Sequence, residues 1–474
     1  MQTYQQQWFH NVRKDVLAGM VVALALIPEA IAFSILAGVD PMVGLYASFT
    51  IAIICAFFGG RPAMISAATG AMALVIVSLV KDHGLQYLLA ATILTGIIQI
   101  IFGYLKSARL MRFIPNAVMI GFVNSLAILV FMAQIPHFTN VSAVSYIFIA
   151  ATIALIYIIP KIIKGIPSPL ITVLLLTPLA MYLSTDMKMV GDLGTISQSL
   201  PTFFIPDVPF TLETLRIILP YALALAVVGL MESLLTAQIL DDMTDTPSDK
   251  NKEARGQGLA NFVNGFFGGM AGCAMIGQSV INVRSGGRGR LSTFVSGAFL
   301  MFLILVLGDY VVSIPMPVLA GIMVTVCIAQ FDWSSFRYVR TAPRTDVIVM
   351  LATVALVIWT HNLAIGVVGG VFISAMFFAA KISAIRVEQH AHTVHVHGQI
   401  FFASTDRLVK AIDAMQFADT HVTINLSDAS LWDDSAVAAI VRMEELLKKT
   451  NCTMTLVGVN ATGKALLEKY NITA

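Results

Sequence analysis

Long apolar segments follow one another along the chain as far as residue 387, and they constrain its fold more than any other feature. A helix needs about 20 apolar residues to cross a bilayer. Full-length candidates begin near residues 15, 87, 112, 142, 167, 211, 290, 343 and 361, and shorter or interrupted ones lie near 41, 68, 256, 275 and 310. Charged residues make up only 12% of the chain, whereas a soluble domain has about 25%. We therefore predict an all-α polytopic membrane protein, and these nine plus five candidates give fourteen spans.

Lysine and arginine are distributed unevenly between the two sides of this predicted topology. With the N-terminus inside, the inner loops hold nineteen Lys and Arg residues, while the outer loops hold Lys81, Lys188 and Arg216. Loops rich in Lys and Arg stay in the cytoplasm. We therefore expect a multi-pass protein of the inner (plasma) membrane with both termini in the cytoplasm.

The tetrapeptide Phe-Phe-Gly-Gly occurs twice, at Phe57–Gly60 and at Phe266–Gly269, each time near a Gly/Ala/Ser-rich run. The copies lie at matching places in two predicted seven-span halves, about residues 12–186 and 208–384. Because seven is odd, the second half is inverted, and inverted repeats with short, broken helices are typical of secondary transporters. After each copy we expect an extended segment and then a half-helix, whose N-terminus carries unpaired N–H groups. Two facing N-termini would bind an anion, although small residues also allow helices to pack tightly.

Three longer motifs resemble one transporter family. They are "PEAIAFSILAGVDPMVGLYAS" (Pro28–Ser48), "NVRSGGRGRLS" (Asn282–Ser292) and "HNLAIGVVGGVFISA" (His361–Ala375). In this order they resemble the sulfate permease (SulP) family of anion transporters, in its bacterial form. The resemblance implies fourteen spans in two inverted repeats, with a core domain that carries the anion against a gate domain. It also implies a cytoplasmic STAS domain and usually a homodimer.

The resemblance also implies where the anion would bind. The expected substrate-binding residues lie at the start of the third span, at the start of the tenth span and on the first span: Thr69, Gly70, Ala71, Ala274, Met275, Ile276, Gly277, Gln278 and Phe33. Some relatives carry arginine where Gln278 stands. Without that fixed positive charge the site attracts anions less, and this favours transport of the anion together with a cation.

Two carboxylates, Glu29 and Glu232, stand inside apolar segments on the equivalent first and eighth spans. An ionised carboxylate at mid-membrane costs about 3 kcal/mol, and binding a proton or a metal cation would remove that cost. We expect ion coupling at Glu232, with Thr236 and Glu29 as further candidates. Relatives that use sodium resemble this chain at Glu232 and Thr236, but Ile276 replaces a hydroxyl, so protons are favoured over sodium. The alternative is a structural carboxyl that caps free N–H groups near a broken helix.

The remaining residues, 388–474, have the pattern of a soluble α/β domain, so residues 1–387 form the predicted transport domain. Strands are expected within 392–403, 421–429 and 452–460, and helices over 435–450 and 461–470. This pattern resembles a STAS domain, which would offer a surface to a cytoplasmic partner. Asp434 stands where bacterial antagonists of this fold carry a phosphorylated serine. A permanent negative charge argues against a switch there, and Ser435 is either modified or caps the following helix.

Two further patterns in this region resemble a phosphate-binding loop and a metal site, but each lacks residues that such a site needs. "GVNATGK" (Gly458–Lys464) has the spacing of a phosphate-binding loop, but Ala465 replaces the Ser or Thr that would hold magnesium. Histidines alternate near the first strand, where they form either a metal site or a polar strand edge: His390, His392, His395 and His397. We expect no metal site, no cofactor and no ATP hydrolysis.

We predict a secondary active transporter of bicarbonate, sulfate or a dicarboxylate, with proton-coupled symport through an elevator-type motion. Sodium-coupled symport and anion exchange are the alternatives. A nucleobase carrier would need polar side chains for the ring, and "AMIG" at the tenth span offers few. A membrane-tethered STAS scaffold would transport nothing. Neither an enzyme nor a nucleic-acid partner is expected.

Overall fold

The computed structural model describes residues 4–106, 114–139, 141–163, 167–183, 187–194, 196–417, 421–470 and 472. Compact packing divides the chain into two units, residues 1–371 and 372–474. The end of the first predicted repeat, at residues 184–186, lies outside the described residues, as do Arg109, Arg112 and Lys164 of the predicted inner loops.

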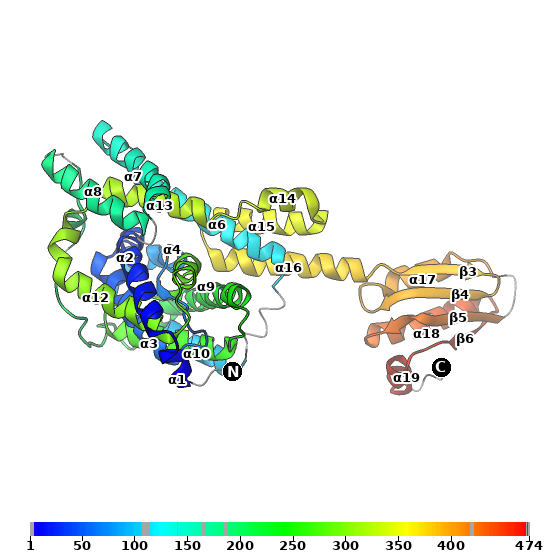
Figure 1. Cartoon of the computed structure of the whole chain (residues 1–474). Helices are drawn as coiled ribbons and strands as arrows, with labels where there is room; N and C mark the ends of the chain where they lie inside the picture. The colour runs from blue at the N-terminus through cyan, green and yellow to red at the C-terminus, as the bar shows by residue number, and fades with distance from the viewer. Residues whose placement is uncertain are drawn as a thin grey trace. The chain divides into compact units, whose positions relative to one another are not determined.

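The first half of the membrane region consists of helices and one short strand (Figure 1). Its elements are α1 (Tyr4–Phe9), α2 (Val12–Ala37), α3 (Pro41–Phe58), β1 (Ser66–Ala68), α4 (Gly70–His83), α5 (Leu85–Tyr104), α6 (Asn116–Gln134), α7 (Ala143–Ile162) and α8 (Ser168–Tyr182). Within the described connections, short 3₁₀ turns lie at Ile135–His137 and Val190–Asp192.

The second half repeats this pattern. Its elements are α9 (Leu212–Thr244), α10 (Lys250–Phe266), β2 (Gly272–Ala274), α11 (Ile276–Arg284), α12 (Arg290–Val312), α13 (Met316–Gln330), α14 (Ser335–Thr341), α15 (Arg344–Thr360) and α16 (Leu363–Ile382). A helix begins close to each predicted span start. Among the described residues, nine helices are long and apolar enough to cross a membrane. The predicted all-α membrane fold is confirmed, while the count of fourteen spans stays a prediction.

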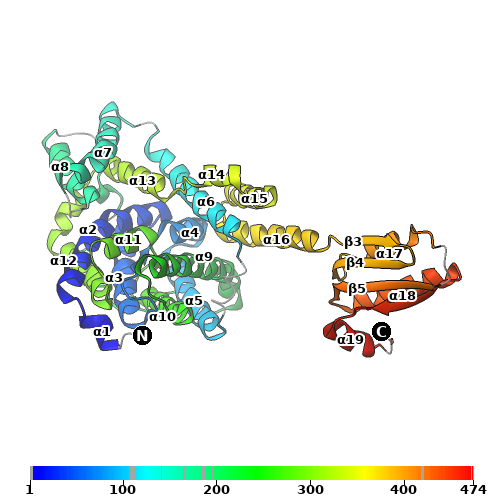
Figure 2. The ribbon, with the colours of Figure 1, turned by 45° about the vertical axis from the view of Figure 1, so that its right-hand side comes forward.

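Helices of the first unit pack in two groups (Figures 1 and 2). In one group, α2 packs on α3, α4, α11 and α12, and α9 packs on α4, α5, α10 and α11. In the other, α13 packs on α6, α7 and α8, and α6 packs on α15. The groups meet chiefly where α2 packs on α13 and α8 and where α4 packs on α6. We call them the α2 group and the α13 group.

Two extended segments cross inside the α2 group. β1 and β2 pair antiparallel, with Ser66 opposite Ala274, Ala67 opposite Cys273 and Ala68 opposite Gly272. Every residue of both strands is buried. Because the strands are antiparallel and each leads into a helix, α4 and α11 begin at opposite ends of the strand pair. The expected extended segments and half-helices are therefore present.

The second unit contains the end of α16 and a four-stranded sheet in the order β3-β4-β5-β6. Its strands are β3 (Arg386–His390), β4 (Thr393–Ile400), β5 (His421–Leu431) and β6 (Thr453–Val457), and its helices are α17 (Thr405–Asp413), α18 (Asp434–Lys449) and α19 (Ala461–Glu468). β3 is antiparallel to β4, and the other pairs are parallel. Alternating apolar residues of β4 and β5, such as Val394, Val396, Val422 and Ile424, form the buried core with Ile440 and Met443 of α18. β3 and α17 were not predicted.

Candidate functional site

A cavity of about 620 Å³ lies between the α2 group and the α13 group. Its lining includes nine of the predicted residues: Glu29, Phe33, Thr69, Gly70, Glu232, Met275, Ile276, Gly277 and Gln278. The α13 group contributes Asn116, Tyr157, Ser168, Thr325 and Gln330, and Asp332 follows α13. Residues that are far apart in the sequence thus share one cavity, as expected.

The two half-helices present their N-termini differently to this cavity. Thr69 is the N-cap of α4, and its hydroxyl accepts a hydrogen bond from the Met72 N–H at 3.4 Å. Met275 is the N-cap of α11 and provides no side-chain cap. The first N–H groups of a helix lack partners within the helix, and they attract negative charge. The uncapped start of α11 therefore offers more free donors than the start of α4.

The Glu232 carboxylate accepts a hydrogen bond from Cys273, which the sequence identifies only as one of the small residues before the tenth span. The Cys273 thiol donates to Glu232 Oε2 at 2.9 Å. Thr69 Oγ1 lies 3.1 Å from Cys273 Sγ. All three side chains are buried. They form a hydrogen-bonded chain from the cap of α4 through β2 to the carboxylate on α9.

Glu29 has a separate partner on the other half of the repeat. Gln278 Nε2 on α11 donates to Glu29 Oε1 on α2 at 2.9 Å. Gln278 Oε1 is buried without a hydrogen-bond partner. Pro28 lies inside a continuous α2, and Glu29 bonds the side-chain amide of Gln278 on another helix.

Three predicted residues do not line the cavity. Ala71 is buried in the first turn of α4. The Ala274 N–H donates to Ser233 Oγ at 3.0 Å, so it supports β2. The Thr236 hydroxyl donates to the Glu232 backbone carbonyl at 2.7 Å. Thr236 therefore fixes the turn of α9 that carries Glu232 and does not contact the Glu232 carboxylate through this bond.

Buried amides hold the extended backbone of β2. Asn261 of α10 accepts from the Gly272 N–H at 2.9 Å and donates to the Gly272 carbonyl at 3.0 Å. Gln257 donates to the same carbonyl at 3.1 Å. Backbone polar groups without partners are expensive in a membrane, so these amides allow a strand to exist there. Two amides four residues apart, Gln257 and Asn261, within a predicted span were the signal for them.

Asp332 is a third carboxylate on the cavity, and it was not predicted. It follows the apolar run of α13 directly, which was the available signal. Its Oδ1 accepts from the Ser334 N–H at 3.0 Å and from the Ser334 hydroxyl at 2.6 Å. Among the described residues that line the cavity there are three carboxylates and no Lys, Arg or His.

The start of α18 corrects one interpretation of the tail. Asp433 is the N-cap, and its Oδ1 accepts from the Ala436 N–H at 3.0 Å, so Ser435 does not cap this helix. Asp434 hydrogen-bonds with Tyr470, and this contact raises the pKa of the Tyr470 phenol. The loop at Gly458–Lys464 instead leads into an ordinary cap, since Asn460 accepts from the Gly463 N–H at 2.8 Å.

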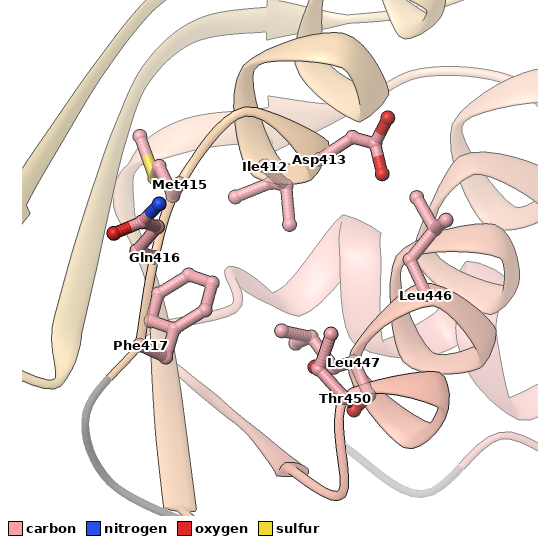
Figure 3. A pocket seen from close by; sticks show the side chains of 8 residues that line it. All are labelled: Ile412, Asp413, Met415, Gln416, Phe417, Leu446, Leu447 and Thr450. Atoms are coloured by element: carbon pink, nitrogen blue, oxygen red, sulfur yellow. Dashed lines mark hydrogen bonds between the residues drawn. The ribbon is translucent and has the colours of Figure 1, made fainter.

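The second unit has a cavity of its own, of about 360 Å³, beside the ends of α17 and α18 (Figure 3). Ile412, Phe417 and Leu447 line it, with Asp413 and Gln416 nearby. No predicted site residue lies there. His397 Nδ1 is 3.3 Å from Asp428, and His390 Nε2 is 3.9 Å from Glu388. Within the described ranges, no three His, Cys, Asp or Glu side chains are placed to hold a metal.

Comparison with known proteins identifies the family. The family model named Sulfate permease family matches residues 12–161 and 144–353, and the STAS domain model matches residues 384–474. The chain is 59% identical over 472 residues to YbaR, a candidate sulfate transporter of Bacillus subtilis, and the match covers 98% of both proteins. It is 28% identical over 424 residues to the bicarbonate transporter BicA of Picosynechococcus sp., which covers 82% of this chain and 74% of that protein.

Solved structures agree with this assignment. The transmembrane domain of a cyanobacterial bicarbonate transporter BicA matches with a TM-score of 0.67 at 27% identity, over 77% of this chain and 98% of that chain. The murine anion transporter Slc26a9 in its inward-facing state matches with a TM-score of 0.84 at 17% identity, over 97% of this chain and 87% of that chain. At 17% identity this second likeness shows the fold alone. The chain belongs to the sulfate permease family, whose members are anion transporters rather than enzymes, and it carries a STAS domain after its membrane region.

Proposed function

We propose that the protein is a proton-coupled symporter of a small oxyanion or carboxylate, with bicarbonate, sulfate and a dicarboxylate as the candidate substrates. The anion would bind at the N-termini of α4 and α11, and Glu232 would carry the coupling proton. Relatives named as sulfate and bicarbonate transporters support the first two substrates.

The charge of the cavity carries this proposal. Its described lining holds Glu29, Glu232 and Asp332 without any Lys, Arg or His. An anion that enters such a cavity is repelled by each ionised carboxylate. Protonation of a carboxylate removes that repulsion and leaves the helix N–H groups to bind the anion. Anion and proton therefore bind most favourably together, and binding linkage makes the effect reciprocal.

The surroundings of Glu232 support a proton rather than sodium. Hard cations prefer several oxygen ligands. One Glu232 oxygen is bonded to the Cys273 thiol, and Ile276 on α11 is apolar. The Thr236 hydroxyl bonds the backbone carbonyl of Glu232. Few oxygens remain to surround a sodium ion.

The packing of the helices supports an elevator-type motion. The cavity lies between the α2 group and the α13 group, which pack on each other chiefly through α2 and α4 on one side and α13, α6 and α8 on the other. Movement of the α2 group past the α13 group would carry an anion bound at α4 and α11. The distribution of Lys and Arg supports an inner-membrane location with both termini in the cytoplasm.

The test is transport by purified protein in proteoliposomes, with labelled sulfate, bicarbonate and fumarate and with proton and sodium gradients imposed in turn. Wild-type protein is expected to accumulate one of these anions under an inward proton gradient. Glu232→Gln resembles the protonated form, so it should bind and exchange the anion without proton-driven accumulation. Glu213→Gln, an exposed glutamate on the same helix, is the matched control and should behave as wild type.

Each contrary result has a definite meaning. If Glu232→Gln still accumulates substrate under a proton gradient alone, Glu232 is not the coupling residue and Glu29 becomes the candidate. Accumulation driven only by sodium would replace the proton in the proposal. Absence of any anion movement by well-folded protein would favour a STAS-dependent scaffold.

A further inference from the structure

Cys273 lies behind the wall of the cavity, between two residues that form that wall. Thr69 and Glu232 line the cavity, and Cys273 does not. Its sulfur is 3.1 Å from Thr69 Oγ1 and 2.9 Å from Glu232 Oε2. Cys273 is fully buried on β2, opposite Ala67 in the strand pair. The thiol thus links the cap of α4 to the carboxylate on α9.

Counting hydrogens gives the direction of each bond when Glu232 is ionised. A carboxylate only accepts, while a thiol and a hydroxyl each donate one hydrogen. The Cys273 S–H therefore points to Glu232. The sulfur can then only accept from Thr69, so the Thr69 hydroxyl points at sulfur and away from the cavity.

Protonation of Glu232 adds one hydrogen to this chain. The new acid O–H can donate to the Cys273 sulfur, and the S–H can then turn to Thr69 Oγ1. The Thr69 hydroxyl hydrogen is displaced from the sulfur and is free to point into the cavity. One proton enters from solution, the other two hydrogens only rotate about their bonds, and no covalent bond to sulfur breaks.

We propose that Cys273 is a positioning residue that transmits the protonation of Glu232 to Thr69, so that Thr69 donates a hydrogen bond to the anion only when the proton is bound. This inference rests on the proposed proton coupling. Besides the loss of charge repulsion, it adds a hydrogen-bond donor, the Thr69 hydroxyl, that faces the anion only when Glu232 is protonated. Charge repulsion acts at any distance within the cavity, whereas this chain acts through one hydroxyl at the start of α4.

Other titratable groups near Glu232 are few. Glu29 and Asp332 face the same cavity from α2 and from the end of α13. The elements packed against α9 are α4, α5, α10, α11 and β2. Apart from Cys273, their titratable side chains lie toward the ends of those helices: Lys81, Asp82, His83, Tyr87, Tyr104, Lys250, Lys252, Glu253, Arg255 and Arg284. Glu29 bonds Gln278 and Asp332 bonds Ser334, so both would add to the repulsion from outside the Thr69–Cys273–Glu232 chain.

The test compares anion affinity at mildly acidic and at neutral pH in purified protein. Sulfate is the probe because its charge is constant over this range, and fumarate replaces it if the wild type does not bind sulfate. One hydrogen bond to a charged group changes binding by at least about tenfold, so wild-type affinity should rise at least that much at acidic pH. In Cys273→Ala the Thr69 hydroxyl loses its sulfur acceptor and is free at both pH values. Its affinity at neutral pH should match or exceed that of wild type, and the pH ratio should fall by about tenfold, the contribution of that hydrogen bond.

Two variants distinguish this hydrogen-bond relay, from Glu232 through Cys273 to Thr69, from simple damage to the fold. Cys273→Ser keeps a group that both donates and accepts, and it should restore the pH ratio. Cys327→Ala removes another buried cysteine, on α13 and outside the cavity lining, and should leave the ratio unchanged. Weaker binding of Cys273→Ala by the same factor at both pH values would show that the residue only shapes the wall, and the relay would be wrong.

Failure of the relay differs from failure of the coupling. If Glu232→Gln removes the pH dependence of binding but Cys273→Ala keeps it, protons are coupled without the relay. If wild-type binding does not change with pH, the coupling itself is wrong.

Infrared spectroscopy gives a readout that requires no anion. The S–H stretching band of Cys273, isolated by subtracting the Cys273→Ala spectrum, should shift as Glu232 is protonated and should stay fixed in Glu232→Gln. A band that stays fixed in the wild type while the Glu232 carboxyl band titrates would overturn the relay.

Discussion

The two Phe-Phe-Gly-Gly turns have the same sequence, but different chemistry holds them. At the first, the Gly60 and Arg61 N–H groups donate to Glu253 Oε2 at 2.6 and 2.9 Å. Arg290 donates to the Ala56 and Gly59 carbonyls at 2.9 and 2.8 Å. At the second turn the partners are uncharged. The Asn264 side-chain amide donates to the Met270 carbonyl at 2.7 Å, the Asn264 backbone carbonyl accepts from the Gly269 N–H at 3.1 Å, and the Phe204 N–H donates to the Phe266 carbonyl at 2.9 Å.

The repeated tetrapeptide leads from a helix to an extended strand in both halves, while the neighbouring residues determine how strongly each turn is stabilised. The charged turn is the copy that the predicted topology places on the cytoplasmic side, where Lys and Arg gather. The neutral turn would lie on the opposite side. Each turn feeds one extended strand, so both must be rigid for β1 and β2 to pair.

The half-helices that follow the turns differ in the same way. A Cβ atom at Gly70 would lie 2.9 Å from Phe33 Cε1 and 3.1 Å from Val130 Cγ2, so the start of α4 is crowded. A Cβ atom at Gly277 would have no atom within 4 Å apart from its chain neighbours and the backbone of its own helix, so the start of α11 is open. The two ends of the site are therefore not equivalent, although the repeat makes them correspond.

Removal of Glu253 should have the largest effect, on stability. Glu253→Ala leaves two buried N–H donors without partners, and each such donor costs about 1–3 kcal/mol. Asn264→Ala should lower the melting temperature in detergent by less, because its turn is neutral and Gly269 keeps its backbone bond. Glu253→Gln is the matched control, since its amide oxygen can still accept both bonds. Equal melting temperatures for Glu253→Ala and wild type would show that the charged turn does not need its acceptor.

Gly70→Val should have the next largest effect, on binding. The added side chain must displace Phe33 or Val130, and its methyl groups should cover the first N–H groups of α4. Loss of this contact should weaken sulfate binding by about a hundredfold or more, which is about 2.7 kcal/mol. Size-exclusion chromatography establishes that the variant folds, and Gly70→Ala should give an intermediate loss. Wild-type affinity in folded Gly70→Val would remove the anion from α4.

The positions of the helices could be read from the sequence, because a bilayer demands long apolar segments with internal hydrogen bonds. The paired turns also predicted an extended segment before each half-helix. Their antiparallel pairing, with Ala67 opposite Cys273, could not be read, since a three-residue strand has no periodicity to interpret. The role of Cys273 depends on this register and on which side of β2 faces α9. No local pattern carries that information.

The tail shows a similar limit. "RVEQH" forms β3 because it pairs with β4 at the edge of the sheet, and its charged composition alone does not favour a strand. Helix α17 covers only Thr405–Asp413, which is short for a pattern to be recognised. Three polar residues in a row, Asp433, Asp434 and Ser435, indicate a helix start, but only the structure shows that Asp433 is the cap.

Gly277→Ala should have the smallest effect, and its size tests how unequal the two helix starts are. The added methyl group meets no atom, so the fold needs no adjustment. Replacing glycine inside a helix should stabilise α11 by about 0.5–1 kcal/mol, because the unfolded chain becomes less flexible. The methyl group takes a small part of a cavity of about 620 Å³, so sulfate affinity should fall by only about threefold, comparable to 0.6 kcal/mol. Binding and melting temperature, measured beside Gly70→Ala, give the comparison directly. If Gly277→Ala loses binding as completely as Gly70→Val, the anion lies against the backbone of α11, and the uncapped helix start forms the tighter half of the site.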